Sequence, residues 1–339
     1  MKTRRYEPHD VSPPQAPPES PAAAPKVTQV TVDERGAGQR LDNFLARILK
    51  DVPRAHIFRV IRKGEVRVNG KRAKPEARLL ANDIVRVPPV RTGAQAPPRR
   101  APSALLESVT GAIVHEDAQL LVIDKPAGVA VHGGSGVSFG VIESLRAARP
   151  NENLELVHRL DRDTSGLLLV ARKPAALRTL HALLREGKVE KRYLALVKGK
   201  WELGKKRIDV PLRTDIRVGG ERTVKAHASG KEAASVFKPV QFFGKKASLV
   251  EVSLETGRTH QIRVHATHAG YPLAGDEKYG DAQFNERMKA VGLKRMFLHA
   301  HQLSFVWPET GVEFSASAPL PADLAAVIDK LGDQKRGSG

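Results

Sequence analysis

The 339-residue chain has no cysteine, few aromatic residues (5%) and no long uncharged apolar run. The missing cysteines exclude disulfides, thiolate nucleophiles and cysteine metal ligands, and they are compatible with a reducing cytosol. No apolar segment follows MKTRRYEPHD, which argues against a secretory signal, and Glu7, Asp10 and Glu19 argue against a transit peptide. The sequence also lacks a basic amphipathic helix with aromatic anchors. We therefore expect a cytoplasmic protein without membrane contact.

Positive charge, by contrast, is abundant. The 56 Lys and Arg residues against 37 Asp and Glu give a formal net charge of +19. Such an excess favours a polyanionic partner, because each neutralised phosphate releases counterions. A soluble protein with a basic surface has the same composition, so charge alone does not identify the partner.

Two proline-rich segments divide the chain. The segment 1–25 contains SPPQAPPESPAAAP and is predicted to be a disordered tail, because it cannot bury enough apolar surface to offset ordering. A second such stretch, PPVRTGAQAPPRRAPS, predicts a linker over residues 89–104. We therefore expect a small domain over 31–88 and a larger one over 105–332.

The small domain has helical and hairpin patterns with a basic cluster. QRLDNFLARIL and PRAHIFRVIRKG predict two helices, and EVRVNGKRAK alternates with period two and turns at Asn69-Gly70. Any one of its basic residues fits a solvated face, but the cluster favours phosphate contact. These residues are Arg54, Arg59, Arg62, Lys63, Arg67, Lys71, Arg72 and Lys74. RLDNFL, RKGEVRVNGK and LLANDIVRVP resemble the S4 RNA-binding domain, which implies binding to structured RNA.

The larger domain mixes strand and helix patterns. Strands are predicted at LLVID, LLLVAR and YLALVKG, together with a long hairpin that turns at Gly244. Helices are predicted at PAALRTLHALLRE, at THQIRVHATHA with Thr259 as its cap and Gly270 as its stop, and at PADLAAVIDKL. Strands outnumber helices, so the fold class is α+β with a mainly antiparallel sheet.

The stretch LVHRLDRDTSGLLLVARK places an acid among basic residues. Asp163 precedes Thr164-Ser165-Gly166 and is interpreted as a turn residue. Asp161, by contrast, follows the apolar Leu160 and is flanked by Arg159 and Arg162. Neighbouring arginines favour the ionised carboxylate, which suits a nucleophile or base. A structural ion pair is the commoner origin of such a pattern.

A second stretch, ETGRTHQIRVHATHAGYPLAGDEKYG, has three histidines: His260, His265 and His268. They suggest a metal site, but the glutamate of H-E-x-x-H and other acidic ligands are missing, so we favour phosphate contact or packing and expect no metal. GGSG at 133–136 is a weak phosphate-loop signal without the Lys-Ser/Thr of a P-loop. HRLDRD is similar to the H-R-D motif of protein kinases. However, the sequence has no Gly-rich nucleotide loop before it and no D-F-G after it, so we reject a kinase function.

Taken together, these stretches resemble one family. HRLDRDTSGLLLVARK resembles the aspartate motif of bacterial pseudouridine synthases that modify ribosomal large-subunit RNA. LVIDKPAGVAVHGG, KRYLALVKG, TGRTHQIRVHATHAGYPLAGDEKYG and FLHAHQLSF resemble the family's other motifs, in its order. The resemblance implies a catalytic domain with a mixed, mainly antiparallel sheet that follows an S4 domain in the sequence. It also implies that the protein isomerises 23S rRNA uridines in and around the peptidyl-transferase region to pseudouridine without a cofactor.

The same resemblance assigns roles to residues. Asp161 matches the essential aspartate, Tyr193 the tyrosine that stacks on the target base, and Arg263 the basic residue paired with the aspartate. Arg159 matches the arginine that fills the stack when uridine flips out. The predicted RNA contacts are His158, Arg159, Arg258 and His260, with Arg54, Arg62, Lys63, Arg67, Lys71 and Arg72 in the S4 domain.

The implied reaction fits these residue types. The base must be extruded from the RNA, and an inserted guanidinium and a stacked tyrosine offset part of that cost. The sequence leaves open whether Asp161 attacks C1′ or abstracts the C2′ proton. It also leaves open whether the substrate is naked rRNA or a large-subunit assembly intermediate. We expect the protein to be a monomer. The rival hypotheses are an RNA-binding assembly factor without activity and a metal-dependent nuclease.

Overall fold

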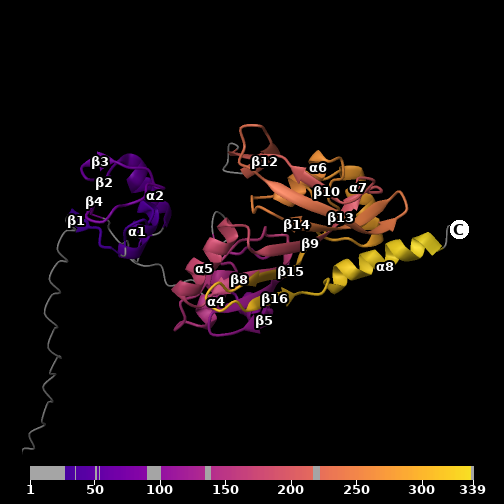
Figure 1. The fold of residues 1–339 in the computed structure, drawn as a ribbon, viewed down its shortest axis with the longest axis horizontal. Helices are drawn as coiled ribbons and strands as arrows, with labels where there is room; N and C mark the ends of the chain where they lie inside the picture. Colours follow the sequence, from indigo (N-terminus) through magenta and orange to yellow (C-terminus); the bar gives the residue numbers. More distant parts are fainter. Residues whose placement is uncertain are drawn as a thin grey trace, which may run out of the picture. The chain divides into compact units, whose positions relative to one another are not determined.

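The computed structural model describes residues 27–34, 36–49, 52, 54–89, 101–133, 139–216 and 222–336. They form two compact units, which divide at Arg99/Arg100 (Figure 1). The predicted tail and most of the predicted linker lie outside the described residues. Strand β1 begins at Thr28, three residues before the predicted start of the small domain, and helix α3 begins at Ser103, two residues before that of the larger domain. Helix α8 ends at Arg336, beyond the predicted end at residue 332.

The first unit is a small sheet with two helices. Its four strands are antiparallel in the order β1-β4-β2-β3, and the hairpin β2–β3 turns at Asn69-Gly70, as predicted. Its core contains Leu41, Phe44 and Leu45 from α1 and Ile57 and Val60 from α2. The elements are β1 (Thr28–Thr31), α1 (Leu41–Ile48), α2 (Arg54–Lys63), β2 (Arg67–Val68), β3 (Lys71–Arg72) and β4 (Ile84–Val87).

The second unit is built on a ten-stranded sheet. The strand order is β10-β13-β14-β9-β15-β8-β6-β5, with β16 beside β15 and β7 beside β8. Among the pairs described, only β8 with β15 is parallel, so the predicted mixed, mainly antiparallel sheet is confirmed. The strands are β5 (Ile113–Glu116), β6 (Leu120–Lys125), β7 (Glu155–Leu156), β8 (Ser165–Ala171), β9 (Glu190–Lys198), β10 (Lys206–Asp209), β13 (Ala234–Phe243), β14 (Ala247–Leu254), β15 (Leu298–Val306) and β16 (Glu313–Ser317).

Helices pack against both faces of this sheet, and each contributes apolar side chains at helical spacing. Helices α3, α4 and α6 bury residues in the central core, α5 packs on β6 and β8 from the other face, and α7 and α8 share a cluster with β9, β13 and β14. The helices are α3 (Ser103–Thr110), α4 (Val141–Ala148), α5 (Pro174–Arg185), α6 (Gln261–His268), α7 (Ala282–Val291) and α8 (Ala322–Arg336).

A separate hairpin completes this unit. Strands β11 (Leu212–Ile216) and β12 (Arg222–Ala226) pair only with each other among the described strands, and Figure 1 shows β12 beside α6. Leu212 and Val224 bury their side chains against Val264 of α6. The hairpin is therefore attached to the helix that carries the candidate site.

Candidate active site

Asp161 lies in the loop between β7 and β8, whose backbone is fixed on both sides. Leu160 is buried before it, and the amide of Thr164 donates to the Asp161 carbonyl oxygen at 3.2 Å. Gly166 has φ +107°, and a Cβ there would collide with the backbone oxygen of Ala300 in β15. Only glycine therefore lets β8 approach β15 at this point. The Asp161 side chain is 24% exposed, so a rigid loop presents it to solvent.

A buried lysine anchors this loop. The Nζ atom of Lys125, fully buried at the end of β6, donates to the carbonyl oxygens of Pro126 and Val129 at 2.8 Å and of Arg162 at 3.0 Å. The amide of Gly128 also donates to the Arg162 oxygen, at 2.8 Å. Burial lowers the pKa of Lys125 to about 7, while the three carbonyls satisfy its N–H groups. Lys125 thus ties the loop after β6 to the Asp161 loop.

Arg263 of α6 faces Asp161. Its Nη1 lies 3.3 Å from Asp161 Oδ2, while its Nε and Nη2 donate to the two carboxylate oxygens of Asp276 at 2.7 and 2.8 Å. Burial alone would raise the pKa of Asp276 and lower that of Arg263. The mutual hydrogen bonds outweigh burial, so the pKa of Asp276 lies below its usual range and that of Arg263 above. The bidentate contact orients Nη1 toward Asp161.

The arginines that flank Asp161 in the sequence, which were expected to favour its ionised form, do not supply this contact. Among the described residues, the Asp161 carboxylate has no ion pair with Arg159 or Arg162, and Arg162 Nε instead lies 3.4 Å from Asp163 Oδ1. Successive side chains around a tight turn point in different directions. The cation therefore comes from Arg263, 102 residues further along the chain.

His260 is the second basic side chain beside Asp161. Its Nε2 lies 3.9 Å from Asp161 Oδ2, and its Nδ1 lies 2.8 Å from the Tyr279 hydroxyl. The prediction that Thr259 caps α6 is wrong, because His260 is the N-cap residue, with φ +54° and no side-chain cap hydrogen bond. Instead, Gln261 Oε1 accepts the amide of Arg258 at 2.9 Å, so the turn is closed from inside the helix.

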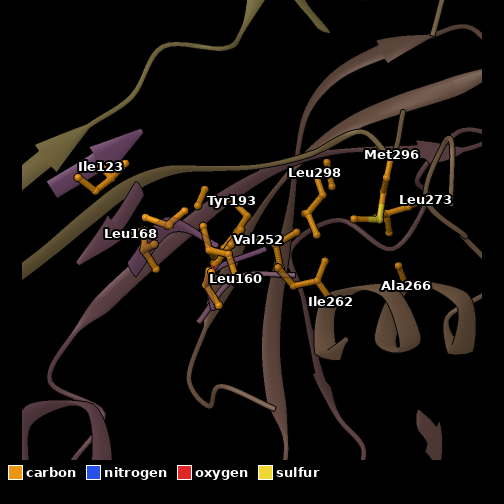
Figure 2. Close-up of a cluster of buried hydrophobic side chains, with 14 of the residues drawn as sticks. Ile123, Leu160, Leu168, Tyr193, Val252, Ile262, Ala266, Leu273, Met296 and Leu298 are labelled. Carbon is orange, nitrogen blue, oxygen red and sulfur yellow. The ribbon is translucent and has the colours of Figure 1, made fainter. Parts of the chain in front are cut away.

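Tyr193 belongs to β9, and its side chain packs beside the loop that carries Asp161. Figure 2 shows its side chain close to Leu160 and Val252 in the central core. Burial and, to a lesser extent, the charge of Asp161 raise the pKa of Tyr193 above its usual range, so the hydroxyl stays protonated at neutral pH. The three residues predicted to be catalytic thus come from a loop, a strand and a helix that meet at one place.

Comparison with known proteins shows which family the chain resembles. The sequence model of the RNA pseudouridylate synthase family matches residues 119–268, and that of the S4 domain matches residues 39–85. The chain is 51% identical over 314 residues to ribosomal large subunit pseudouridine synthase C of Pasteurella multocida, covering 91% of this chain and 95% of that protein. For the Escherichia coli K12 protein of the same name, identity is 50% over 312 residues, covering 90% and 96%. The chain belongs to the RNA pseudouridylate synthase family.

Solved structures of the family share the fold of this synthase. Human RNA pseudouridylate synthase domain containing 4 matches with a TM-score of 0.55 and 25% identity, over 68% of this chain and 96% of that one. Human RNA pseudouridylate synthase domain containing 1 matches with a TM-score of 0.53 and 27% identity, over 67% and 95%. The catalytic unit is therefore that of an isomerase acting on RNA.

The other residues predicted to contact RNA in the synthase unit have different environments. Arg159 is exposed, and its guanidinium makes no hydrogen bond or ion pair with the described residues. Arg258 is also exposed and donates from Nε to the Glu232 carbonyl oxygen at 3.0 Å. His158 accepts the amide of Leu169 on Nε2 at 3.1 Å, and burial lowers its pKa to about 4. Any contact of His158 with RNA at neutral pH therefore uses a neutral ring.

The basic residues predicted in the S4 unit are mostly exposed. The side chain of Arg54 lies outside what the structure describes. Arg67 donates from Nη1 to the Gly70 carbonyl oxygen across the hairpin at 3.1 Å, and Lys63 lies 3.8 Å from Glu65. The remaining exposed members are Arg62, Lys71 and Arg72.

The histidines of α6 do not form a cluster suited to a metal. His265 is buried, with Nδ1 3.0 Å from the Ser235 hydroxyl and Nε2 3.0 Å from the Val210 carbonyl oxygen. Over the described ranges, no group of three His, Asp or Glu side chains could hold a metal ion, and no helix is long and apolar enough to cross a membrane. Of the GGSG stretch, only Gly133 is described.

Sequence reasoning missed three residues of the site. Asp276 orients Arg263, Lys125 holds the Asp161 loop, and Tyr279 contacts His260. Each lies inside a stretch that resembles a family motif, namely LVIDKPAG or GDEKYG. Their location inside these motifs was the only feature of the sequence that could have identified them, because their roles depend on partners elsewhere in the chain.

Proposed function

We propose that this chain isomerises uridines of 23S rRNA to pseudouridine, as the name of its 50% identical relatives indicates for them. The observation that carries the proposal is the Asp161 carboxylate. It lies on a loop fixed at both ends, pairs with Arg263 through Oδ2, and follows Leu160, which packs in the same core cluster as Tyr193. An rRNA substrate also accounts for the +19 charge and for the cytoplasmic location expected from the sequence.

The reaction proceeds on a base flipped out of the RNA stack. Arg159, which is exposed and stands two residues before Asp161 in the sequence, is proposed to fill the gap that the uridine leaves. The flipped base is proposed to stack on Tyr193, whose protonated hydroxyl makes it a neutral aromatic platform. Asp161 then either attacks C1′ or removes the C2′ proton. After the N1 glycosidic bond breaks, the base turns and bonds to the ribose through C5, which loses its proton.

Release of tritium from C5-labelled uridine in unmodified 23S rRNA tests this function. We expect release by the wild type and a loss of at least about 1,000-fold in Asp161→Asn, as for removal of a central acid–base or nucleophilic group. Asp163→Asn is the matched control, because Asp163 is two residues away and 51% exposed. It should keep wild-type activity.

Two results would contradict the proposal. Release by Asp161→Asn at the wild-type rate would remove the carboxylate from the mechanism. Tight RNA binding by the wild type without any release would favour an assembly factor, in which the same residues only hold rRNA.

A further inference from the structure

The Tyr279 hydroxyl lies between a backbone amide and a histidine. Its oxygen accepts the amide of Val224, in the hairpin β11–β12, at 2.9 Å, and it lies 2.8 Å from His260 Nδ1. A tyrosine hydroxyl has one proton, and the Val224 amide can only donate, so that proton is free to go to Nδ1. His260 Nδ1 is then an acceptor, and the proton of the neutral ring is on Nε2.

The protonated nitrogen of His260 faces Asp161. Nε2 lies 3.9 Å from Asp161 Oδ2, the same oxygen that Arg263 Nη1 approaches at 3.3 Å. Burial lowers the pKa of His260, and the charges of Arg263 and Lys278 lower it further, against the opposite influence of Asp161 and Asp276. The ring therefore offers Asp161 an N–H dipole rather than a second cation.

The two carboxylate oxygens of Asp161 consequently differ. Oδ2 faces both Arg263 and His260, whereas Oδ1 makes no hydrogen bond or ion pair with any residue that the structure describes. Oδ1 is thus the oxygen that is available to a bound nucleotide.

The backbone of His260 also indicates a selected conformation. Its φ is +54°, and the other non-glycine residues with positive φ in the described ranges are Asn69 and Asn82. Asparagine, aspartate and histidine enter this left-handed region more readily than other non-glycine residues, but holding any of them there has a cost, and such strain gathers at functional sites.

Tyr279 itself is held rigidly enough to impose this orientation. The guanidinium of Arg263 lies over its ring at 4.9 Å from the centroid, its amide donates to Asp276 Oδ1 at 3.0 Å, and its carbonyl accepts Thr267 Oγ1 at 2.9 Å. The hydroxyl therefore cannot turn away from His260 without disturbing the Arg263–Asp276 pair.

We propose that Tyr279 and His260 are a positioning pair, in which the Tyr279 hydroxyl fixes the tautomer of His260 so that its Nε2–H holds Asp161 Oδ2 and leaves Oδ1 to the substrate. The proposal rests on the proposed function, because it gives Asp161 its catalytic role. The 3.9 Å separation closes to a hydrogen bond when RNA fills the site, as contacts in catalytic sites do on substrate binding.

Tyr279→Phe tests the pair, because it keeps the ring against Arg263 and removes only the hydroxyl. We expect kcat for tritium release from 23S rRNA to fall about 10- to 100-fold with KM unchanged, since RNA contacts are retained and only the orientation of Asp161 is lost. Tyr271→Phe is the matched control. Its hydroxyl likewise accepts a backbone amide, that of Glu202 at 3.3 Å, and it should keep the wild-type kcat.

His260→Asn separates orientation from folding. Asparagine accepts the left-handed backbone but is too short to reach Asp161, so kcat should fall as in Tyr279→Phe while the melting temperature does not decrease. The double variant should be no slower than the slower single variant, because the two side chains act in series.

A spectrum of the free protein tests the tautomer without any turnover. In 15N spectra, the wild-type resonance that disappears in His260→Asn should show the Nε2–H tautomer, and Tyr279→Phe should lose this preference. A wild-type Nδ1–H tautomer, or an unchanged kcat in Tyr279→Phe, would overturn the proposal. Because the spectrum needs no RNA, that result is distinguishable from a failure of the proposed function, which would appear as no tritium release by the wild type.

Discussion

At the scale of single residues, the Arg263–Asp276 pair decides how the Asp161 carboxylate is held. Asp276 is 2% exposed and binds the guanidinium through both oxygens, so Arg263 has one nitrogen left for Asp161. An unpaired buried arginine is costly, and a guanidinium without its bidentate partner can rotate.

Asp276→Asn should therefore reduce both activity and stability. We expect kcat/KM for tritium release to fall about 10- to 100-fold and the free energy of unfolding to fall by about 3 kcal/mol, as for a broken buried pair. Urea unfolding followed by tryptophan fluorescence measures the second quantity. Glu277→Gln, one residue away and exposed, is the control and should change neither. A wild-type rate in Asp276→Asn would show that Arg263 keeps its orientation without this partner.

The sequence predicts single residues only where a motif marks them. Asp161, Tyr193 and Arg263 were identified by family resemblance, and the structure brings them together. Asp276 and Lys125 were missed because an acid or a lysine in a motif gives no indication of the carbonyls or guanidinium that it will meet. The same limit applies to Arg159 and Arg162, whose place beside Asp161 in the sequence does not reveal that its ion pair is with Arg263.

At the scale of elements, the start of β8 is held by a buried chain of hydrogen bonds. Arg295 Nη1 donates to the Ser165 hydroxyl at 3.2 Å, the Ser165 oxygen lies 3.0 Å from His299 Nδ1, and His299 Nε2 lies 3.3 Å from the Ala318 carbonyl oxygen. A neutral His299 with its proton on Nε2 satisfies every member of this chain, because the Ser165 hydroxyl then donates to Nδ1 and Nε2–H donates to Ala318. Burial lowers the pKa of His299 to about 4.

This histidine should make the synthase unit sensitive to acid. The unfolded chain binds a proton near pH 6.5 and the folded chain only near pH 4, so unfolding takes up a proton between these values and stability is lost as pH falls. Between pH 7 and 5, His299 should remove about 2 kcal/mol of unfolding free energy. Tryptophan fluorescence reports on this unit alone, because Trp201 and Trp307 are the two tryptophans of the chain.

Replacement of His299 identifies its share of the pH dependence. His299→Gln should show a shallower fall in unfolding free energy from pH 7 to 5 than the wild type. His268→Gln, at an exposed position, should keep the wild-type slope. Equal slopes in all three proteins would mean that His299 is not the group that takes up the proton.

Periodicity predicted several elements well and others poorly. Helix α5, with Pro174 at its first position, and the long hairpin β13–β14 were predicted and are confirmed. The predicted Thr259 cap of α6 was wrong, because Gln261 closes that turn through a contact that cap statistics do not include. Helices α3, α4 and α7 were not predicted. Their roles became visible only through the sheet and the neighbouring helix against which they pack.

At the scale of the whole molecule, the positive charge and the S4 unit point to RNA binding over a surface larger than the active site. The S4 unit has its own hydrophobic core, and its exposed basic side chains lie on α2 and the hairpin β2–β3. Each of these cations that meets a phosphate adds to the salt dependence of binding. The S4 unit should therefore contribute affinity without taking part in the reaction.

Removal of two such charges tests this division of labour. In Arg62→Gln/Lys71→Gln, we expect the slope of log affinity for 23S rRNA against log salt concentration to become shallower by about 1.5, because two phosphate contacts on structured RNA are lost. At saturating RNA, kcat for tritium release should stay at the wild-type value, since the residues proposed to act on the base all belong to the synthase unit. Lys245→Gln/Lys294→Gln removes the same charge from exposed positions of the synthase unit. If this control flattens the slope as much as the S4 variant does, the salt dependence reflects net charge alone, and the S4 unit makes no specific phosphate contacts through these two residues.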